Sequence, residues 1–436
     1  MPSTVRIGSG AGFAGDRIGP AVDLVREGSL DDIVLECLAE RTIALGQGRR
    51  RADPNQGHDI HAEARMRALL PETLPRNVRI ISNLGAANPV AAGKLTAAIA
   101  AELGLSCKVA VVTGDDVLAH LDLDLPAMED GKPLASHGEI ISANAYLGAE
   151  ALMPGLAAGA DVVITGRVAD PSLFVAPLAD RFGWELSDTT AMANATLVGH
   201  LLECGAQITG GYFADPGTKD VPGLDQLGYP YADVTKDGHI TVGKLDSSGG
   251  FVDRRTVREQ ILYEIIDPGA YLTPDVTLNL YGVSTTTVER DRVRVEGAVG
   301  QERPEKLKTS VGYRAGYRAE AEISYAGPGC VERARLAGTT VRARMGEAGR
   351  SLRIDVIGSL QEDGAANMLE CRLRVAGLTP TIDQAKSVCL EVESLYTNGP
   401  AGGGGVRTAV TEIIGIVSTL MSRDSVSPET TIVEAS

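Results

Sequence analysis

Apolar and polar residues alternate in two different ways along this chain. Between Val5 and Gly211, short runs of β-branched residues such as Val109–Val112 and Val162–Ile164 are bounded by glycine or polar residues. Such runs are typical of strands that are buried on both faces. Segments with helical periodicity, such as residues 61–72, separate these runs. The alternation of strand and helix predicts an α/β fold with a doubly wound, mostly parallel sheet.

The pattern changes near residue 277, where alternating strands and one helix over residues 330–345 follow. Strands followed by helices predict a smaller α+β domain. We therefore divide the chain into an α/β core domain, residues 1–276, which carries the site, and an α+β C-terminal domain, residues 277–436. Four glycines at residues 402–405 predict a flexible loop or a nest of backbone amides before a last helix.

The amino-acid composition limits the kinds of molecule that the protein is expected to bind. The formal net charge is −16 without a run of lysine or arginine, which argues against nucleic acid and anionic membranes. No apolar run is long enough to span a bilayer, and the N-terminus shows no secretory signal. The six cysteines lie far apart in apolar contexts, which favours reduced thiols over disulfides or a zinc site. We therefore expect a cytoplasmic protein.

The candidate chemistry is concentrated between Gly159 and Gly211. A strand ends at Thr165 and Gly166, Arg167 follows, and Asp170 with a proline after it predicts the start of a helix. A cation beside a helix N-terminus makes an anion-binding site. The helix that leads into this strand is expected over residues 142–159.

Two further segments repeat the order of strand, Thr-Gly and aspartate. One strand ends at Thr113 and delivers Asp115 and Asp116, and a strand near residues 207–209 leads through Gly210 and Gly211 to Asp215. In an open parallel sheet, ligands bind beyond the carboxyl ends of the strands. We therefore expect Asp116, Arg167 and Asp215 to surround one pocket for a small anion.

Proton transfer has its candidates on a helix close to this stretch. His200 and Glu203 are three residues apart and project from the same side of a helix. The alternative is structural, with Arg167 and Asp170 forming a buried pair and His200 capping a helix. The predicted catalytic residues are Asp116, Arg167, Asp170, His200 and Glu203.

Glycine-rich loops supply candidate binding groups. Gly10, Gly12 and Gly15 match the spacing of a dinucleotide-binding loop, and Glu36 lies about 20 residues on, at the distance expected for a ribose contact. Pro20 falls where the phosphate-binding helix should continue. An NAD(P) site, a generic phosphate or substrate loop, and a simple tight turn therefore all remain open.

Serines and asparagines complete the predicted substrate contacts. Residues 247–250, Ser-Ser-Gly-Gly, precede a helical segment and form a second candidate anion cradle. Asn83 lies at a strand end, and Asn88 precedes a proline as a helix cap would. The predicted substrate-binding residues are Gly10, Gly12, Asn83, Asn88, Asp115, Thr165, Gly166, Gly210, Gly211, Asp215, Ser247, Ser248 and Gly249.

Several collinear strings resemble one family along nearly the whole chain. They are GSGAGFAGDR, SNLGAANP, VVTGDD, SANAYLGA, ITGRVADPSLF, GHLLECGAQITGGYFADPG, YEIIDPGAYLTPDV and NGPAGGGG. Together they resemble the acyclic terpene utilisation family, AtuA. The resemblance implies a role in the breakdown of branched acyclic terpenoids through acyl-CoA thioesters. Many members carry or accompany a small C-terminal domain, which is not evident before Ser436, so a separate small subunit is expected, as is a homo-oligomer.

Three kinds of enzyme and one other role are consistent with these residues. The first is a lyase or hydratase for a carboxylate or acyl-CoA thioester, because addition of water beside a carbonyl needs a base and an anion-binding group. The second is an NAD(P)-dependent oxidoreductase. The third uses a divalent metal held by Asp115, Asp116, His200 and Glu203. The last alternative is a non-catalytic subunit of a larger complex.

Overall fold

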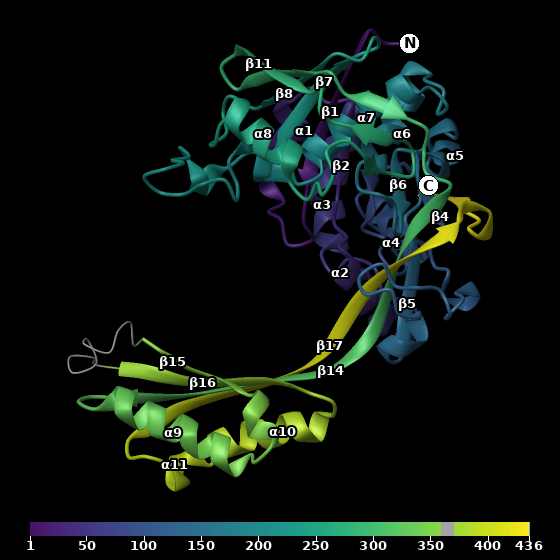
Figure 1. Ribbon diagram of the computed structural model, residues 1–436. Coiled ribbons are helices and arrows are strands. Elements are labelled where there is room, and N and C mark those ends of the chain that lie inside the picture. Colours follow the sequence, from purple (N-terminus) through teal and green to yellow (C-terminus); the bar gives the residue numbers. More distant parts are fainter. Residues whose placement is uncertain (359–369, 436) are drawn as a thin grey trace. The chain divides into compact units, whose positions relative to one another are not determined.

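The computed structural model describes residues 1–358 and 370–435 and forms two compact units (Figure 1). Unit 1 contains residues 1–134, 141–312 and 416–436, and unit 2 contains residues 135–140 and 313–415. The boundary inferred from the sequence, between residues 276 and 277, lies inside unit 1. The reason is that strands after residue 277 pair within unit 1.

Unit 1 is built on a ten-stranded mixed sheet. Five neighbouring strands in its centre are parallel, and antiparallel strands extend the sheet on both sides. The α/β class is therefore confirmed, and the sheet is parallel only in its core. The spatial order is β11 (Ser284–Glu289), β12 (Arg292–Glu296), β8 (Ile240–Lys244), β7 (Pro230–Thr235), β1 (Thr4–Ala11), β2 (Asp32–Leu35), β3 (Arg79–Ser82), β6 (Val162–Thr165), β4 (Cys107–Thr113) and β18 (Glu429–Ala435).

Helices cover both faces of the parallel core. Successive side chains of a strand point to opposite faces, and on β4 Val111 packs against Gly93 of one helix while Ala110 packs against Gly155 of another. A methyl group at Gly93 would lie 2.3 Å from Val111 Cγ2, so this helix approaches the sheet as closely as only glycine allows. The first face carries α1 (Gly19–Glu27), α3 (Ala62–Thr73) and α4 (Pro89–Glu102), and the other carries α5 (Met153–Ala157), α6 (Ser172–Phe182) and α7 (Thr189–Leu202).

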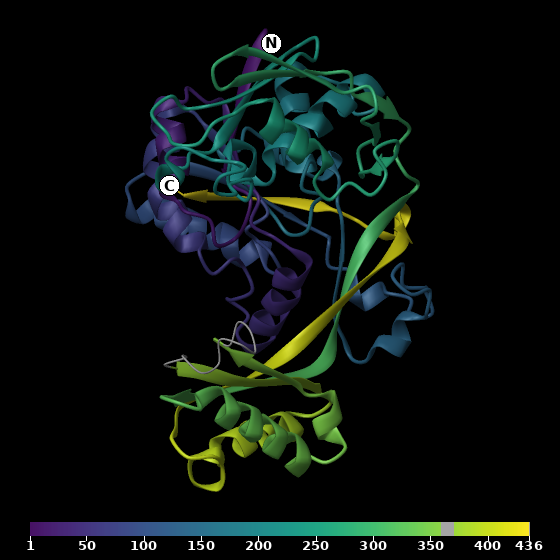
Figure 2. The ribbon, with the colours of Figure 1, turned by 60° about the vertical axis from the view of Figure 1, so that its left-hand side comes forward.

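Unit 2 is an antiparallel sheet with helices on one face (Figure 2). Alternate residues of β14, from Ala319 to Tyr325, pack against the helices, while Glu320 and Glu322 on the other face pair with Arg374 and Arg372. Its elements are β15 (Arg353–Ile357), β16 (Glu370–Thr379), α9 (Cys330–Arg344), α10 (Ile382–Glu393), α11 (Leu395–Asn398) and parts of β14 (Lys306–Ala326) and β17 (Gly403–Ser422). Residues 306–312 of β14 and 416–422 of β17 belong to unit 1.

Four local expectations are corrected by the structure. Residues 142–159 begin in β5 (Ile140–Ala145) and contain a 3-10 helix (Ala149–Ala151) and the short α5 instead of one long helix. Residues 207–209 belong to a 3-10 helix (Gly205–Thr209), not to a strand. The glycines at 402–405 lead into β17, and β18 follows it, so the expected last helix is absent from the described residues. Pro20 lies in the first turn of α1, where proline is compatible with a helix.

Among the described residues, no helix has the length and apolar character needed to cross a membrane. The six cysteines are reduced thiols in the structure, and five of them are buried.

Asp275 is buried and joins two elements of unit 1. Its carboxyl oxygens accept hydrogen bonds from Ala149 N at 2.7 Å and from Ser172 Oγ at 2.5 Å. Burial raises the pKa of Asp275 to about 6, although the Ser172 bond opposes the shift. The folded state therefore binds this proton more tightly than the unfolded state, whose aspartate pKa is about 3.9, and the free energy of unfolding falls as pH rises between these values.

We expect Asp275→Asn to reduce this loss of stability with rising pH, because asparagine does not ionise. Urea unfolding at about pH 4.5 and about pH 7.5 measures the change. The matched control is Asp246→Asn, at an exposed position, which should keep the wild-type pH dependence. Equal pH dependence in both variants would contradict the assigned shift.

Candidate active site

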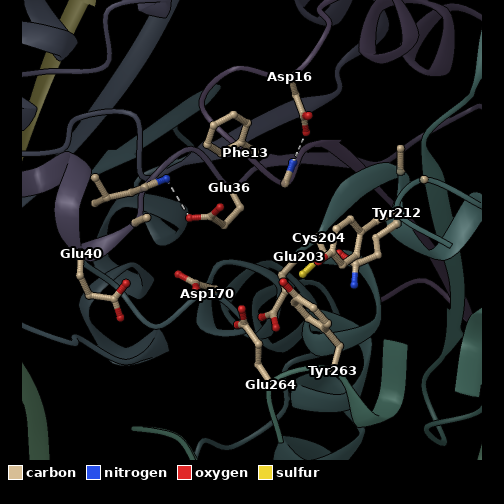
Figure 3. A pocket seen from close by; sticks show the side chains of 16 residues that line it. Phe13, Asp16, Glu36, Glu40, Asp170, Glu203, Cys204, Tyr212, Tyr263 and Glu264 are labelled. Carbon is tan, nitrogen blue, oxygen red and sulfur yellow. Dashed lines mark hydrogen bonds between the residues drawn. The ribbon is translucent and has the colours of Figure 1, made fainter. Parts of the chain in front are cut away.

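A cavity of about 550 Å³ lies beyond the carboxyl ends of β1, β2 and β6 in unit 1 (Figure 3). Its walls come from the loop after β1, the residues after β2 and β6, the end of α7, and the segment after α8 (Arg254–Leu262). Carboxyl groups dominate it, and we call it the acidic lobe. Its side chains labelled in Figure 3 are Phe13, Asp16, Glu36, Glu40, Asp170, Glu203, Cys204, Tyr212, Tyr263 and Glu264.

A second cavity of about 340 Å³ adjoins the first. Met128, Leu272, Leu307 and Leu420 give it an apolar lining, and Lys306 and Lys308 add positive charge. We call it the apolar lobe. The two lobes share five lining residues, which we call the waist: Glu40, Asp170, Glu203, Tyr263 and Glu264.

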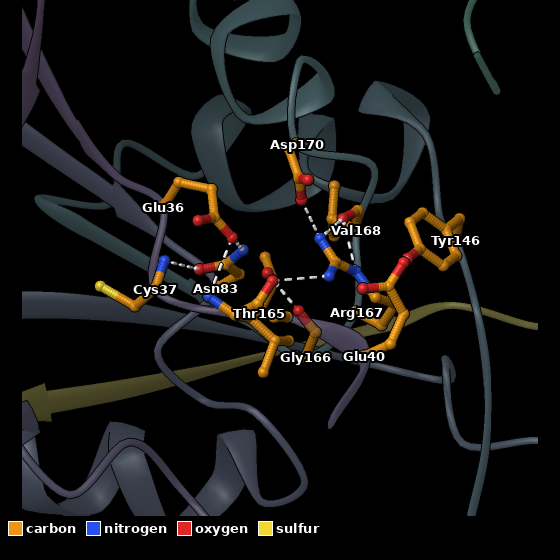
Figure 4. A network of polar contacts seen from close by, with 12 residues as sticks. Glu36, Cys37, Glu40, Asn83, Tyr146, Thr165, Gly166, Arg167, Val168 and Asp170 are labelled. Carbon is orange, nitrogen blue, oxygen red and sulfur yellow. Dashed lines mark hydrogen bonds and ion pairs between the residues drawn. The ribbon is translucent and has the colours of Figure 1, made fainter. Parts of the chain in front are cut away.

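Arg167 lies beside two residues of the waist, Asp170 and Glu40 (Figure 4). It is only 1% exposed, and its guanidinium donates to the carbonyls of Leu38 (2.8 Å) and Val168 (2.6 and 2.9 Å) and to the carboxylate of Asp170. Its backbone N–H donates to Asp115 Oδ2 at 2.8 Å. Arg167 therefore ties together the chain segments that follow β2, β4 and β6. With these partners, its guanidinium is committed to the protein and is not presented to a substrate anion.

Burial, hydrogen bonds and neighbouring charges shift the protonation of the carboxyl groups in the site. Removal from bulk water raises the pKa of Asp170 to about 7, although 36% of its side chain is exposed; the Arg167 charge opposes this shift, and Glu203 and Glu40 add to it. Burial likewise raises the pKa of Glu36 well above its ordinary value. Burial also acts to raise the pKa of Glu40, but hydrogen bonding from Tyr146 and the charge of Lys308 lower it to about 2. The waist therefore contains a carboxyl group that exchanges its proton near neutral pH beside one that stays ionised.

His200 and Glu203 form a hydrogen-bonded pair at the end of α7. His200 Nε2 lies 3.1 Å from the Ile261 carbonyl, which can only accept, so this nitrogen carries a proton. His200 Nδ1 lies 3.0 Å from Glu203 Oε1. Burial alone would lower the pKa of His200, but its contacts with Glu203 outweigh that effect and raise it. Within the described chain, Glu203 Oε2 is buried and has no hydrogen-bond partner, and the residue lines the waist.

Two large side chains on the cavity wall have left-handed backbone conformations. Tyr212 and Glu264 both have φ = 60°. This region costs a non-glycine residue roughly 1–2 kcal/mol, and such strain is concentrated at functional sites. The rest of the fold therefore keeps Tyr212 and Glu264 in a strained backbone conformation at the cavity wall.

The structure brings together four predicted catalytic residues and several predicted binding residues. Asp170 and Glu203 line both lobes, His200 lines the apolar lobe, and Arg167 lies behind Asp170. The binding residues differ in their distance from the cavity. Gly12 and Gly211 line the acidic lobe, Asn83 donates to Glu36 behind it, Thr165 and Gly166 precede Arg167, and Gly10 is inside β1 against Ile33.

Asp116 lies elsewhere, although its neighbour Asp115 contacts Arg167. Both aspartates and Asn88 line a separate cavity of about 470 Å³. Asp116 accepts a hydrogen bond from Gln47 at 2.9 Å, and Asn88 caps α4, as the sequence predicted.

The remaining predicted contacts also lie apart from the two lobes in the described structure. Asp215 forms hydrogen bonds with Thr218 and Lys219 in its own loop. It does not reach the sheet edge, because residues 207–209 are not a strand that ends there. Asp253 caps α8, so Ser247 and Ser248 bond instead to Glu27 and to the Leu245 carbonyl. Gly210 packs on Val221, and Gly249 packs on the Gly223 carbonyl.

Asp170 does not cap the helix after it, because its carboxylate is directed to Arg167 and α6 has no side-chain cap. Glu40, Tyr263 and Glu264 line the site although the sequence did not identify them, and Glu36 was expected only as a ribose contact. The sequence pattern could have identified Glu36 and Glu40 as site residues. They follow the carboxyl end of β2, just as Asp170 follows the carboxyl end of β6.

The glycine loop is not arranged for a dinucleotide. Gly12 N–H donates to Asp16 Oδ2 at 2.8 Å, and Glu36 accepts from Asn83 and Leu38. A pyrophosphate at this loop would meet the carboxylate of Asp16 instead of a free amide. Within the described ranges, no three or more His, Cys, Asp or Glu residues are grouped to hold a metal ion.

Comparison with known families agrees with the resemblance drawn from the sequence. The model of the acyclic terpene utilisation family protein AtuA matches residues 5–432. The chain belongs to the AtuA family. No curated protein and no solved structure matches it.

We expect Arg167→Met to destabilise unit 1 by about 3–5 kcal/mol, because it removes a buried cation and leaves its carbonyl and carboxylate partners unpaired. Denaturant unfolding measures this change. Arg350→Ala, at an exposed position of unit 2, is the control and should change stability by less than about 0.5 kcal/mol. A similarly small effect of Arg167→Met would contradict the supporting role.

Proposed function

We propose that this member of the AtuA family is a cytoplasmic enzyme, a lyase of the hydratase type. Its substrate is a small carboxylate or an acyl-CoA thioester of branched-acid or terpenoid metabolism. The observation that carries the proposal is the position of Asp170, a carboxyl group with a pKa of about 7 at the waist of a two-lobed cavity. A group with such a pKa can both donate and accept a proton near neutral pH.

The second proton-transfer group is Glu203. Its Oε1 is held by His200, its buried Oε2 has no hydrogen-bond partner among the described residues, and Glu203 lines the waist together with Asp170. In the direction of water loss, the Glu203 carboxylate takes the proton from the carbon beside the carbonyl. The C–O bond of the neighbouring carbon breaks, and the departing hydroxide takes the proton of Asp170 and leaves as water. A carbon–carbon double bond forms, and the reverse steps add water.

The two lobes differ in their lining, and this difference supports one orientation of the substrate in the cavity. The waist contains several carboxyl groups, so a neutral carbonyl such as that of a thioester is more compatible with it than a free carboxylate. Lys306 and Lys308 also line the apolar lobe, and Lys308 pairs with Glu40 at 3.3 Å. The apolar side chains of this lobe suit a branched hydrocarbon group.

We expect Asp170→Asn and Glu203→Gln each to lower kcat for hydration of an enoyl-CoA thioester by about 10²–10⁴-fold, because each removes one proton-transfer group. Steady-state kinetics with a set of branched enoyl-CoA substrates measures the effect. Asp246→Asn, at an exposed position, serves as the control and should retain the wild-type rate.

In the dehydration direction, the rate should fall as pH rises through about 7, because the acid form of Asp170 is lost. Turnover by Asp170→Asn at the wild-type rate, or a rate independent of pH across this range, would contradict the role of Asp170.

A further inference from the structure

A third cavity of about 330 Å³ continues from the acidic lobe and shares Gln207, Tyr212 and Tyr263 with it. We call it the aromatic groove. Its position makes it accessible to a ligand that extends from the waist. The groove is lined by Gln207, Tyr212, Phe213, Thr256, Arg258, Glu259, Gln260, Leu262 and Tyr263.

Tyr212 is exposed at the junction of the groove and the acidic lobe. The residue is 90% exposed and has φ = 60°, whereas the next residue, Phe213, is buried and packs edge-on against Phe251 at 5.8 Å between ring centroids. Phe213 therefore anchors the loop, and the Tyr212 ring contributes little to the core. An exposed aromatic ring held in a strained conformation beside a cavity is suited to stack on a planar ligand group.

Cations of α8 and the neighbouring loop border the same groove. Arg258 lines it and donates to Thr285 Oγ1 at 3.2 Å, and within the described part of the chain it forms no ion pair. Lys219 lies 4.7 Å from the centroid of the Phe213 ring and pairs with Glu259, and Arg255 pairs with Asp253 at 2.7 Å. Arg258 is thus the cation whose charge is available to an anion in the groove.

From these contacts we infer that the aromatic groove binds an adenosine phosphate group, with the base stacked on Tyr212 and a phosphate beside Arg258. The inference rests on the proposed function, because a CoA thioester carries this group at the end opposite its acyl chain. A nicotinamide dinucleotide carries the same chemistry and would enter the groove by the same contacts. The carboxylates of the acidic lobe disfavour phosphate there, so the groove separates the anionic end of the ligand from the reacting end.

The test uses the full chain and measures binding of adenosine 3′,5′-bisphosphate by calorimetry. Wild-type protein should bind this probe more tightly than inorganic phosphate or adenosine alone. Tyr212→Gly should weaken binding at least tenfold while the thermal stability stays equal or rises, because glycine relieves the backbone strain. Arg258→Ala should weaken binding and reduce its salt dependence, while Arg350→Ala in unit 2 should bind as the wild type does.

The source of the adenosine phosphate is tested by competition. Displacement of the probe by CoA and not by NADP⁺ assigns the groove to a CoA thioester. Displacement by NADP⁺ and not by CoA assigns it to a dinucleotide. Both results support an adenosine phosphate site. Asp170→Asn should retain binding of the probe, so loss of turnover in that variant is separable from loss of this site. Equal binding of adenosine 3′,5′-bisphosphate and inorganic phosphate, or equal binding by Tyr212→Gly and Arg350→Ala, would overturn the inference.

Discussion

The burial of one guanidinium constrains the whole site. Arg167 is almost fully inaccessible, and a charge in such an environment is tolerated only when hydrogen bonds and an opposite charge surround it. The chain meets this requirement with the Leu38 and Val168 carbonyls, the Asp170 carboxyl group and the nearby charge of ionised Glu40. Because these groups follow different strands, satisfying Arg167 also positions the walls of the cavity.

Arg167 also lies close to two carboxyl groups whose pKa values differ, those of Asp170 and Glu40. Asp170 interacts with Arg167 and with the charges of Glu203 and Glu40, and burial makes its ionised form costly. Glu40 receives a hydrogen bond from Tyr146 at 2.5 Å and remains ionised. Neighbouring acids whose environments separate their pKa values are a common arrangement for acid and base catalysis. The buried cation thus connects the fold to the chemistry proposed for the waist.

Local patterns were sufficient to predict the parallel core and part of the site. The β-branched runs that form β4 and β6 end at adjacent positions of the sheet, so the closeness of Asp115 and Arg167 follows from their order. The contact of His200 with Glu203 follows from their spacing on α7. These features depend on short-range geometry that the sequence expresses directly.

Other features depend on contacts between distant segments. Residues 403–422 form a strand because they pair with β14, and nothing within the glycine run itself specifies that partner. Ser247 bonds to Glu27, which is 220 residues away, so the serines do not reach α8. The exposure of Tyr212 is likewise a property of the folded loop, which residue type alone does not reveal.

The most direct test of the account is the protonation of Asp170. Carbon-13 NMR of protein labelled at the aspartate carboxyl carbon, with Asp170→Asn to assign the signal, measures its titration. The account predicts a midpoint at about pH 7. A midpoint near the ordinary aspartate value of about 4 would contradict it.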